Sequence, residues 1–177
     1  MPIFKGYETP CDLLAKLLRE GRRVNFSGPG PDDVYDHLFN FCVTAHSLRD
    51  WCIKYLGLTA KAKEDFGSRC NQSVYLQYAR DIANSSKHFT LSRDRTSSVD
   101  TVSKSSHVMS AIGLDGKLLD GHEQTFNSAN ICLPEREPIN SYLFVASVVM
   151  EWQKIFDEYS VPKDERANLS ILALAYV

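Results

Sequence analysis

The sequence predicts a mainly α protein with four helices and a small β-hairpin or loop insert before the last long helix. In the stretches 32–57 and 139–159, apolar residues recur every three or four positions, which is the spacing of one helix face. From residue 90 this periodicity disappears, and the stretch 92–106 is rich in Ser, Thr, Asp and Lys. We therefore expect a single domain over residues 1–177, with the insert at about 90–135.

The composition is that of an ordinary globular protein. The chain has 177 residues, of which 44% are hydrophobic and 24% are charged, enough for a sizeable core. Its net charge of −2 gives no overall attraction for nucleic acid, so an RNA-binding role would need a local basic site. Lys16, Arg19, Arg22 and Arg23 form one candidate, although a solvated helix end is the favoured interpretation of that segment.

The cysteines indicate a reducing compartment. Their number is odd, their spacings are wide, and no Cys-x-x-Cys pair is present, which argues against a disulfide framework and a zinc site. Cys42 and Cys52 are interpreted as small buried hydrophobic residues. The first residues lack the apolar stretch of a signal peptide, and no run approaches the ~18 apolar residues of a membrane span. We expect a cytoplasmic protein without a membrane partner, a cofactor or a metal ion.

The first helix is expected over residues 8–20 and the second over residues 32–57. Thr9 suits the cap of the first helix and Gly21 its end, while Gly57 suits the C-terminus of the second. The second helix has a seam suited to packing against other helices, made of Val34, Leu38, Phe41, Ala45, Leu48, Cys52 and Tyr55.

Another stripe of the second helix carries His46 and Asp50. The two residues are four positions apart, so they lie on the same side of the helix, among apolar residues. Two interpretations stay open. A half-buried histidine held by its own aspartate is favoured over a direct chemical role.

The third helix, expected over residues 68–88, carries a polar face. Asp81, Asn84 and His88 follow one another at intervals of three and four residues, so they line one side of the helix. The polar side chains able to transfer protons or to bind or orient a phosphate group in this half of the helix are Arg80, Asp81, Asn84, Lys87 and His88.

The connector at residues 58–67 is short, which makes the second and third helices antiparallel neighbours. His46 and Asp50 are then expected to face Arg80, Asn84 and His88 across the bundle.

The insert is expected to contain a small, imperfect hairpin. Residues 92–106 predict an exposed loop, and short strands at 108–112 and 117–119 flank an Asp-Gly turn signal. A third short strand is expected at 125–126 or 130–133. The role of the insert stays open between a lid, a dimer arm and a recognition surface.

The fourth helix is expected over residues 139–159, starting near Pro138. Its wide apolar face consists of Tyr142, Val145, Ala146, Val149, Trp152 and Phe156. The tail at 169–177 is apolar at its end and is either a short strand that joins the hairpin or a segment that docks on a partner.

Two stretches carry a resemblance to a known family. Residues 37–51 (HLFNFCVTAHSLRDW) and 79–89 (ARDIANSSKHF) together resemble the HEPN superfamily, whose members are small α-helical bundles found in bacterial toxin, defence and RNA-processing proteins. The resemblance covers residues 32–90 and 138–159 and leaves the insert and the tail outside. It implies an antiparallel four-helix up-and-down bundle that often forms a dimer.

The resemblance also implies an activity. In active members an Arg and a His from each protomer meet at the dimer cleft and cut RNA without a metal ion. Carried over, these residues are Arg80, which would hold the phosphate, and His88, which would transfer a proton near neutral pH. The residues that would support the site or bind phosphate are Asn84, Lys87, Asp81, His46 and Asp50. The expected function is a metal-independent endoribonuclease of a toxin or phage-defence type, acting on RNA as a homodimer formed through the helical bundle.

An alternative stays open beside this activity. The interval between Arg80 and His88 is longer than the family's nuclease motif usually has. The polar cluster would then be a buried network that locks two helices together. In that case the chain is a non-catalytic helical module that binds a protein or a nucleotide partner, in a host–phage conflict or a similar system.

Overall fold

The computed structural model describes residues 5–26, 33–85 and 98–167. Its elements are, in chain order, α1 (Pro10–Asn25), α2 (Asp33–Tyr55), α3 (Ala60–Gln72), α4 (Val74–Ser85), β1 (Thr101–Ile112), β2 (Leu118–Leu133), β3 (Arg136–Asn140), α5 (Ser141–Glu158) and the short 3-10 helix η1 (Glu165–Ala167).

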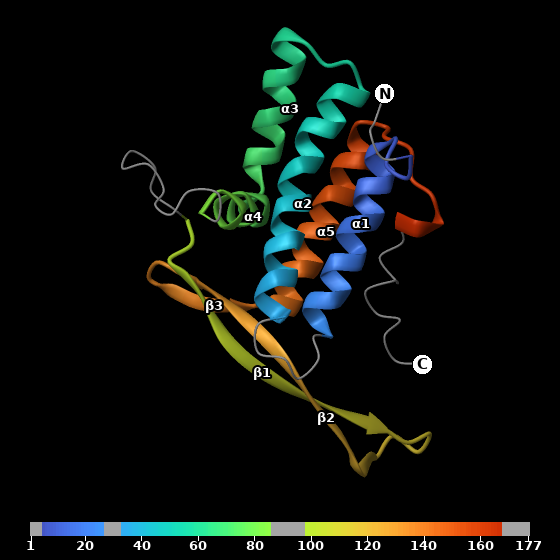
Figure 1. Ribbon diagram of the computed structural model, residues 1–177, viewed down its shortest axis with the longest axis vertical. Coiled ribbons are helices and arrows are strands. Elements are labelled where there is room, and N and C mark those ends of the chain that lie inside the picture. The colour runs from blue at the N-terminus through green and yellow to red at the C-terminus, as the bar shows by residue number, and fades with distance from the viewer. Residues whose placement is uncertain (1–4, 27–32, 86–97, 168–177) are drawn as a thin grey trace.

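The prediction of a mainly α four-helix up-and-down bundle is wrong. The described ranges contain five α-helices and a three-stranded antiparallel sheet of order β1-β2-β3, so the fold is a mixed α/β one. In Figure 1, α1, α2 and α5 run side by side, α4 lies beside α2 and is seen nearly end-on, and the sheet crosses one end of the helical body. From that end the β1–β2 hairpin projects away from the helices.

The helices with a buried seam were predicted closely. The expected helices at 32–57 and 139–159 correspond to α2 and α5, and Gly57 ends α2 with a φ of +64°, a conformation that favours glycine. The helix expected at 8–20 begins with the capping Thr9, as predicted, but continues past Gly21 to Asn25. Gly21 is buried, and packing of the helix offsets its low helix propensity.

The helix expected at 68–88 is two helices instead. The chain breaks between α3 and α4 at Ser73, which has an extended backbone and whose hydroxyl accepts the N–H of Leu76 at 3.4 Å. Most of the expected connector at 58–67 belongs to α3. This helix buries only Phe66 and Cys70, so its sequence lacks the apolar periodicity by which helices are recognised.

The sheet is larger than the expected hairpin. The Asp-Gly turn was predicted correctly: Gly113 N–H donates to the Lys117 carbonyl at 2.8 Å, and Gly116 has a φ of +79°. However, β1 begins at Thr101, within the expected loop at 92–106, and pairs with β2 from Thr101 opposite Cys132 to Ile112 opposite Leu118.

Strand β3 was not predicted, because Pro138, which lies within it, was expected to start the last helix. Proline cannot donate a hydrogen bond to a neighbouring strand, and β3 tolerates it as an edge strand of the sheet.

The root of the sheet belongs to the same core as the helices. Ala129 and Ile131 of β2 are fully buried, as are Phe144 and Val148 of α5. The Ser128 and Ser141 hydroxyls lie 3.0 Å apart in this buried layer and join β2 to the start of α5. The sheet is therefore part of the folded core and not an insert on a self-sufficient bundle.

The expected tail strand or docking segment at 169–177 lies outside the described residues. Among the helices that the structure does describe, none combines the length and the apolar character needed to cross a membrane.

Candidate functional site

The contact between α2 and α4 brings His46 and Arg80 to the same small cavity. The cavity has a volume of about 20 Å³ and lies between α2, the α3–α4 junction and α5. Its lining residues are Ala45, His46, Arg49, Cys70, Asn71, Leu76, Ala79, Arg80 and Trp152. Two of the residues expected to face each other across the helices, His46 and Arg80, are thus near neighbours, and a second arginine, Arg49, joins them.

Arg80 is held by two neighbours. Its Nε and Nη2 atoms both lie 3.0 Å from Asp81 Oδ1, and its Nη1 donates to Asn71 Oδ1 at 3.3 Å. The side chain keeps 25% of its surface exposed. The guanidinium is therefore fixed in position, with part of its surface open to solvent.

Asp81 joins α4 to the chain that leads into β1. Its Oδ2 accepts the N–H of Ser98 at 2.9 Å and the Ser98 hydroxyl at 2.5 Å. Burial alone would raise the pKa of Asp81, but the two Ser98 hydrogen bonds and Arg80 outweigh it and lower the pKa below its usual value. A carboxylate with both oxygens bound and a lowered pKa is poorly suited to act as a general base.

Asp50 lies on the exposed side of α2. Its side chain is 74% exposed, it does not line the cavity, and its Oδ1 accepts a hydrogen bond from Arg49 Nε at 3.4 Å. Asp50 is therefore placed beside Arg49 at the surface and does not face Arg80 across the helices.

The remaining predicted residues lie near or beyond the end of α4. Asn84 is half-buried one turn after Arg80 and outside the lining of the cavity. Lys87 and His88 lie outside the described residues.

Among the lining residues not predicted as part of the site are two polar residues, Arg49 and Asn71, and one aromatic residue, Trp152. Arg49 follows His46 by three positions on α2, and this helical spacing was the available signal. Asn71 and Trp152 come from α3 and α5, and no local pattern connects them to Arg80. The Trp152 side chain is 2% exposed, and its Nε1 has no hydrogen-bond partner among the described residues.

The cluster has the chemistry of an anion site. Two guanidinium groups, an imidazole and an amide are donors suited to phosphate oxygens. A volume of 20 Å³ holds about one water molecule, so a phosphate would contact the mouth of the cavity and not its interior. In the described ranges, no three or more His, Cys, Asp or Glu side chains are arranged to hold a metal ion.

The basic segment of α1 agrees with a solvated helix end. Arg19, Arg22 and Arg23 are exposed, and Arg23 Nη1 donates to Glu20 Oε1 at 2.8 Å. Lys16 is directed to α2, where its Nζ donates to Thr44 Oγ1 at 2.6 Å.

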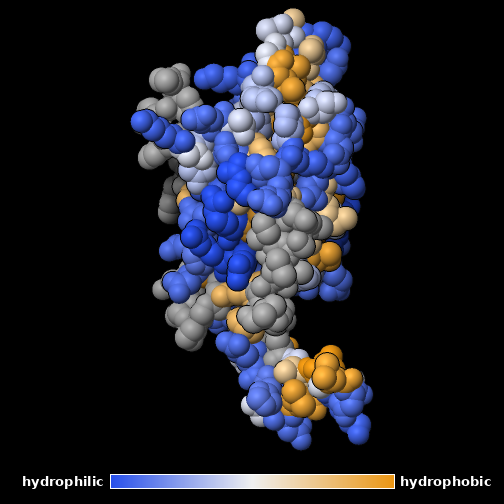
Figure 2. All heavy atoms as spheres, turned by 90° about the vertical axis from the view of Figure 1, so that its right-hand side faces the viewer, coloured by the Kyte–Doolittle hydropathy of each residue, from blue (hydrophilic) through white to orange (hydrophobic). Residues whose placement is uncertain are grey.

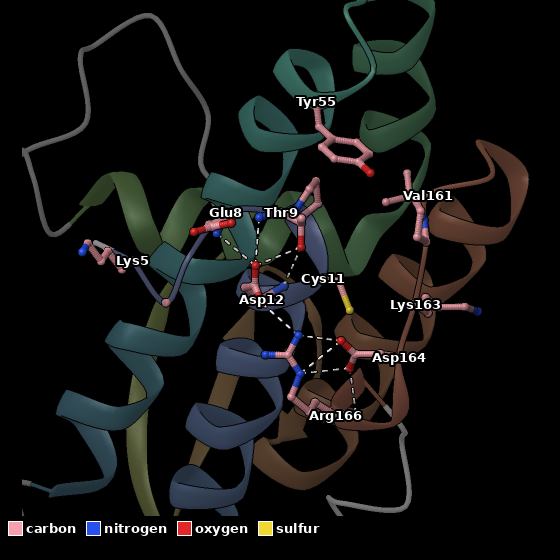
Figure 3. A pocket seen from close by; sticks show the side chains of 13 residues that line it. Lys5, Glu8, Thr9, Cys11, Asp12, Tyr55, Val161, Lys163, Asp164 and Arg166 are labelled. Atoms are coloured by element: carbon pink, nitrogen blue, oxygen red, sulfur yellow. Dashed lines mark hydrogen bonds and ion pairs between the residues drawn. The ribbon is translucent and has the colours of Figure 1, made fainter. Parts of the chain in front are cut away.

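A second cavity, of about 470 Å³, lies at the N-terminal end of α1 (Figure 3). Its walls are the segment before α1, Tyr55 at the end of α2, and residues 161–166. In the centre, Arg166 Nη2 donates to Asp12 Oδ1 at 2.9 Å and to Asp164 Oδ2 at 2.5 Å. This triad fastens the chain after α5 to the first turn of α1.

Asp12 also completes the cap of α1. Its Oδ2 accepts the N–H groups of Glu8 and Thr9 at 3.0 and 2.8 Å, and the Thr9 hydroxyl at 2.9 Å. Partial burial alone would raise the pKa of Asp12, but these bonds and Arg166 lower it to about 2. Only the cap itself could be read from the sequence, because Asp164 and Arg166 lie far along the chain.

The positive and negative side chains that line this second cavity largely pair with one another. The charged side chains of the triad already bind one another, and Lys163 pairs with Asp157. Cys11 is buried, and burial raises the pKa of its thiol, so it is a weak nucleophile. The volume is that of a small-molecule site, but the charges present no strong preference for an anion or a cation.

Fold and site together define a small mixed α/β protein with a cationic cluster between its helices. No family model, curated protein or solved structure matches the chain.

Proposed function

We propose that the chain is a HEPN-like, RNA-binding protein that cuts RNA without a metal ion and acts in the cytoplasm in a toxin or phage-defence role. The observation that carries this proposal is the meeting of His46, Arg49 and Arg80 at one cavity between α2 and α4. An imidazole beside two guanidinium groups combines a group that can accept or donate a proton with groups that bind phosphate.

The reaction assigns a separate role to each side chain. The exposed parts of Arg49 and Arg80, 34% and 25% of their side chains, contact the oxygens of the scissile phosphate and neutralise the charge that develops on them. His46 accepts the proton of the ribose 2′-hydroxyl as the 2′-oxygen attacks phosphorus. The bond from phosphorus to the 5′-oxygen breaks, and His88 donates a proton to that oxygen, leaving a 2′,3′-cyclic phosphate.

The test is cleavage of a 5′-labelled RNA by the purified full-length chain in the presence of a chelator. We expect products ending in a 2′,3′-cyclic phosphate and no cleavage of the same sequence as DNA. His46→Ala and His88→Ala should each slow cleavage by about 10²–10⁴-fold, the usual contribution of a general acid or base. His122→Ala is the matched control, because His122 is exposed on β2, away from the cluster, and should leave the rate unchanged. A wild-type protein that leaves every RNA intact would contradict the proposal.

A second function is favoured by the contacts of Arg80. Its guanidinium is already bound to Asp81 and Asn71, and Asp81 is bound to Ser98, as in a structural network. In this alternative the chain is a non-catalytic module that binds a protein or a nucleotide. Arg80→Ala would then lower the melting temperature, while wild type and variant would both fail to cut RNA. Calorimetric titration with nucleotides would test binding to the cavity of about 470 Å³.

A further inference from the structure

The β1–β2 hairpin extends beyond the body of the protein as an arm, defined here as residues 108–125. Figure 1 shows the hairpin projecting from the end of the helices, and Figure 2 shows hydrophobic residues gathered at its far end. All of its residues whose burial is described are exposed, except Gly113, which is half-buried. The arm is thus a two-stranded ribbon with solvent on both faces.

The arm exposes large aliphatic side chains. The exposed fractions are 62% for Val108, 65% for Ile112, 112% for Leu114, 66% for Leu118 and 41% for Leu119. Ile112 and Leu118 are directly paired across the two strands, so the apolar surface is continuous there. A lone two-stranded ribbon is at best marginally stable in water, and a clustered apolar surface marks an interaction site. The exposed apolar surface of the arm is therefore the kind of surface that a partner covers.

A matching apolar surface lies on α5. Tyr142, Leu143 and Met150 are 54%, 50% and 46% exposed, and Leu143 and Met150, seven positions apart, lie on the same side of the helix. Because the arm projects away from the body that contains α5, it does not cover this surface in its own molecule. One chain thus presents two apolar surfaces that cannot meet within one copy.

We propose that the arm of each copy packs on the α5 surface of a second copy, in a two-fold symmetric dimer with exchanged arms. Two-fold symmetry places both surfaces of both chains in contact, which closes the assembly at two copies. A stable interface of standard size uses about 20–30 residues on each side, and residues 108–125 together with the exposed face of α5 reach that size. This dimer forms through the sheet arm and not through the helical bundle alone.

The first test is the mass of the full-length protein by sedimentation over a roughly hundredfold range of concentration, because association depends on protomer concentration. We expect a wild-type dimer. The double variants Ile112→Asp/Leu118→Asp on the arm and Leu143→Asp/Met150→Asp on α5 should both be monomers that keep the circular dichroism spectrum of the wild type, since all four residues are exposed. Lys63→Asp, at an exposed position of α3 outside both surfaces, should remain a dimer. A monomeric wild type, or an α5 variant that still dimerises, overturns the proposal.

The second test places a photo-cross-linking amino acid at Leu114, the most exposed residue of the arm tip. Protein labelled with ¹⁵N is mixed with unlabelled protein, irradiated and digested. Cross-linked peptides that join the arm of one isotope to α5 of the other support the exchanged arm. Cross-links confined to one isotope, or directed to another element, overturn it. Neither test depends on RNA cleavage, so the dimer and the proposed activity can fail separately.

Discussion

At the scale of single residues, Asp81 divides its two carboxylate oxygens between two segments of the chain. Oδ1 binds the Arg80 guanidinium, and Oδ2 binds the N–H and the hydroxyl of Ser98. The Asp81 residue as a whole is only 9% exposed, so these partners replace the water that a carboxylate would otherwise bind. Asp81 thus positions Arg80 and also joins α4 to Ser98, which lies just before β1.

Asp81→Asn should lower the free energy of unfolding by about 1–3 kcal/mol at neutral pH, because buried donors lose their charged acceptor. The pKa of Asp81 is lower in the folded protein than the ordinary value of an aspartate carboxyl group. Its contribution is therefore fully present above that value and is lost as the pH falls below it. Urea unfolding of wild type and variant at neutral pH and at about pH 3 should show the difference shrinking in acid. Asp50→Asn is the matched control, because its side chain is 74% exposed and should change stability by no more than about 0.5 kcal/mol. An Asp81→Asn effect that grows in acid would contradict the assigned bonds.

At the scale of elements, the caps of α1 and α3 form a natural comparison. Thr9 and Asp12 make a reciprocal capping box at α1, whereas Thr59, the equivalent threonine at α3, makes no side-chain hydrogen bond to its helix. The two helices therefore start with the same residue type and with different contacts.

Thr9→Ala should lower the free energy of unfolding by about 1 kcal/mol, because the Asp12 N–H loses one of its two acceptors, the Thr9 hydroxyl oxygen, and Asp12 Oδ2 loses the Thr9 hydroxyl as a donor. Thr59→Ala should cost clearly less. Thermal unfolding of the two variants beside wild type measures both values. Equal losses would mean that the capping box contributes nothing beyond the preference of the position itself.

The elements that the sequence predicts well are those with a repeated apolar pattern. The seam of α2 and the wide face of α5 both reach the core, so their periodicity survives in the sequence. In contrast, α3 buries two residues, and β1 is Ser-rich and largely exposed, so neither has a pattern that marks it. Their formation depends on neighbours, namely on pairing with β2 and on packing against α2 and α4.

The candidate site, like the fold, was predictable only where a helical pattern marks its residues. The helical spacing of polar residues in the expected helices at 32–57 and 68–88 predicted that His46 and Arg80 would face each other. In the structure the two residues line one cavity. Asn71 and Trp152 were not predictable, because their approach depends on a helix break at Ser73 and on the placement of α5. The bond from Asp81 to Ser98 joins two segments with no common pattern.

At the scale of the whole molecule, the sheet and the helices share one core. Ile131 of β2 is fully buried in the same cluster as the apolar residues of α1, α2 and α5. None of the arm residues whose burial the structure describes belongs to that cluster. The same hairpin therefore packs into the core at its root and is exposed to solvent at its tip within one copy.

Ile131→Ala should lower the free energy of unfolding by about 2–5 kcal/mol, the range for deletion of a buried aliphatic side chain. The transition should remain single, since sheet root and helices unfold together. Far-UV and near-UV circular dichroism during urea unfolding measure this. Val108→Ala, at a position of the arm that is 62% exposed, should change stability by no more than about 0.5 kcal/mol in the monomer. Two separate transitions would mean that the sheet folds as an independent insert.

The reaction of the free cysteines with alkylating reagents can be used to follow how this core opens. Burial raises the pKa of the Cys42 thiol above its ordinary value, and it raises the pKa values of Cys52 and Cys70 to about 12. Because the thiolate is the reactive form, alkylating reagents reach these sulfurs only when the surrounding structure opens. The thiols lie on α2 and α3, and Cys132 adds a half-buried one on β2. The order in which they are alkylated therefore records the order in which helices and sheet open, without any introduced label.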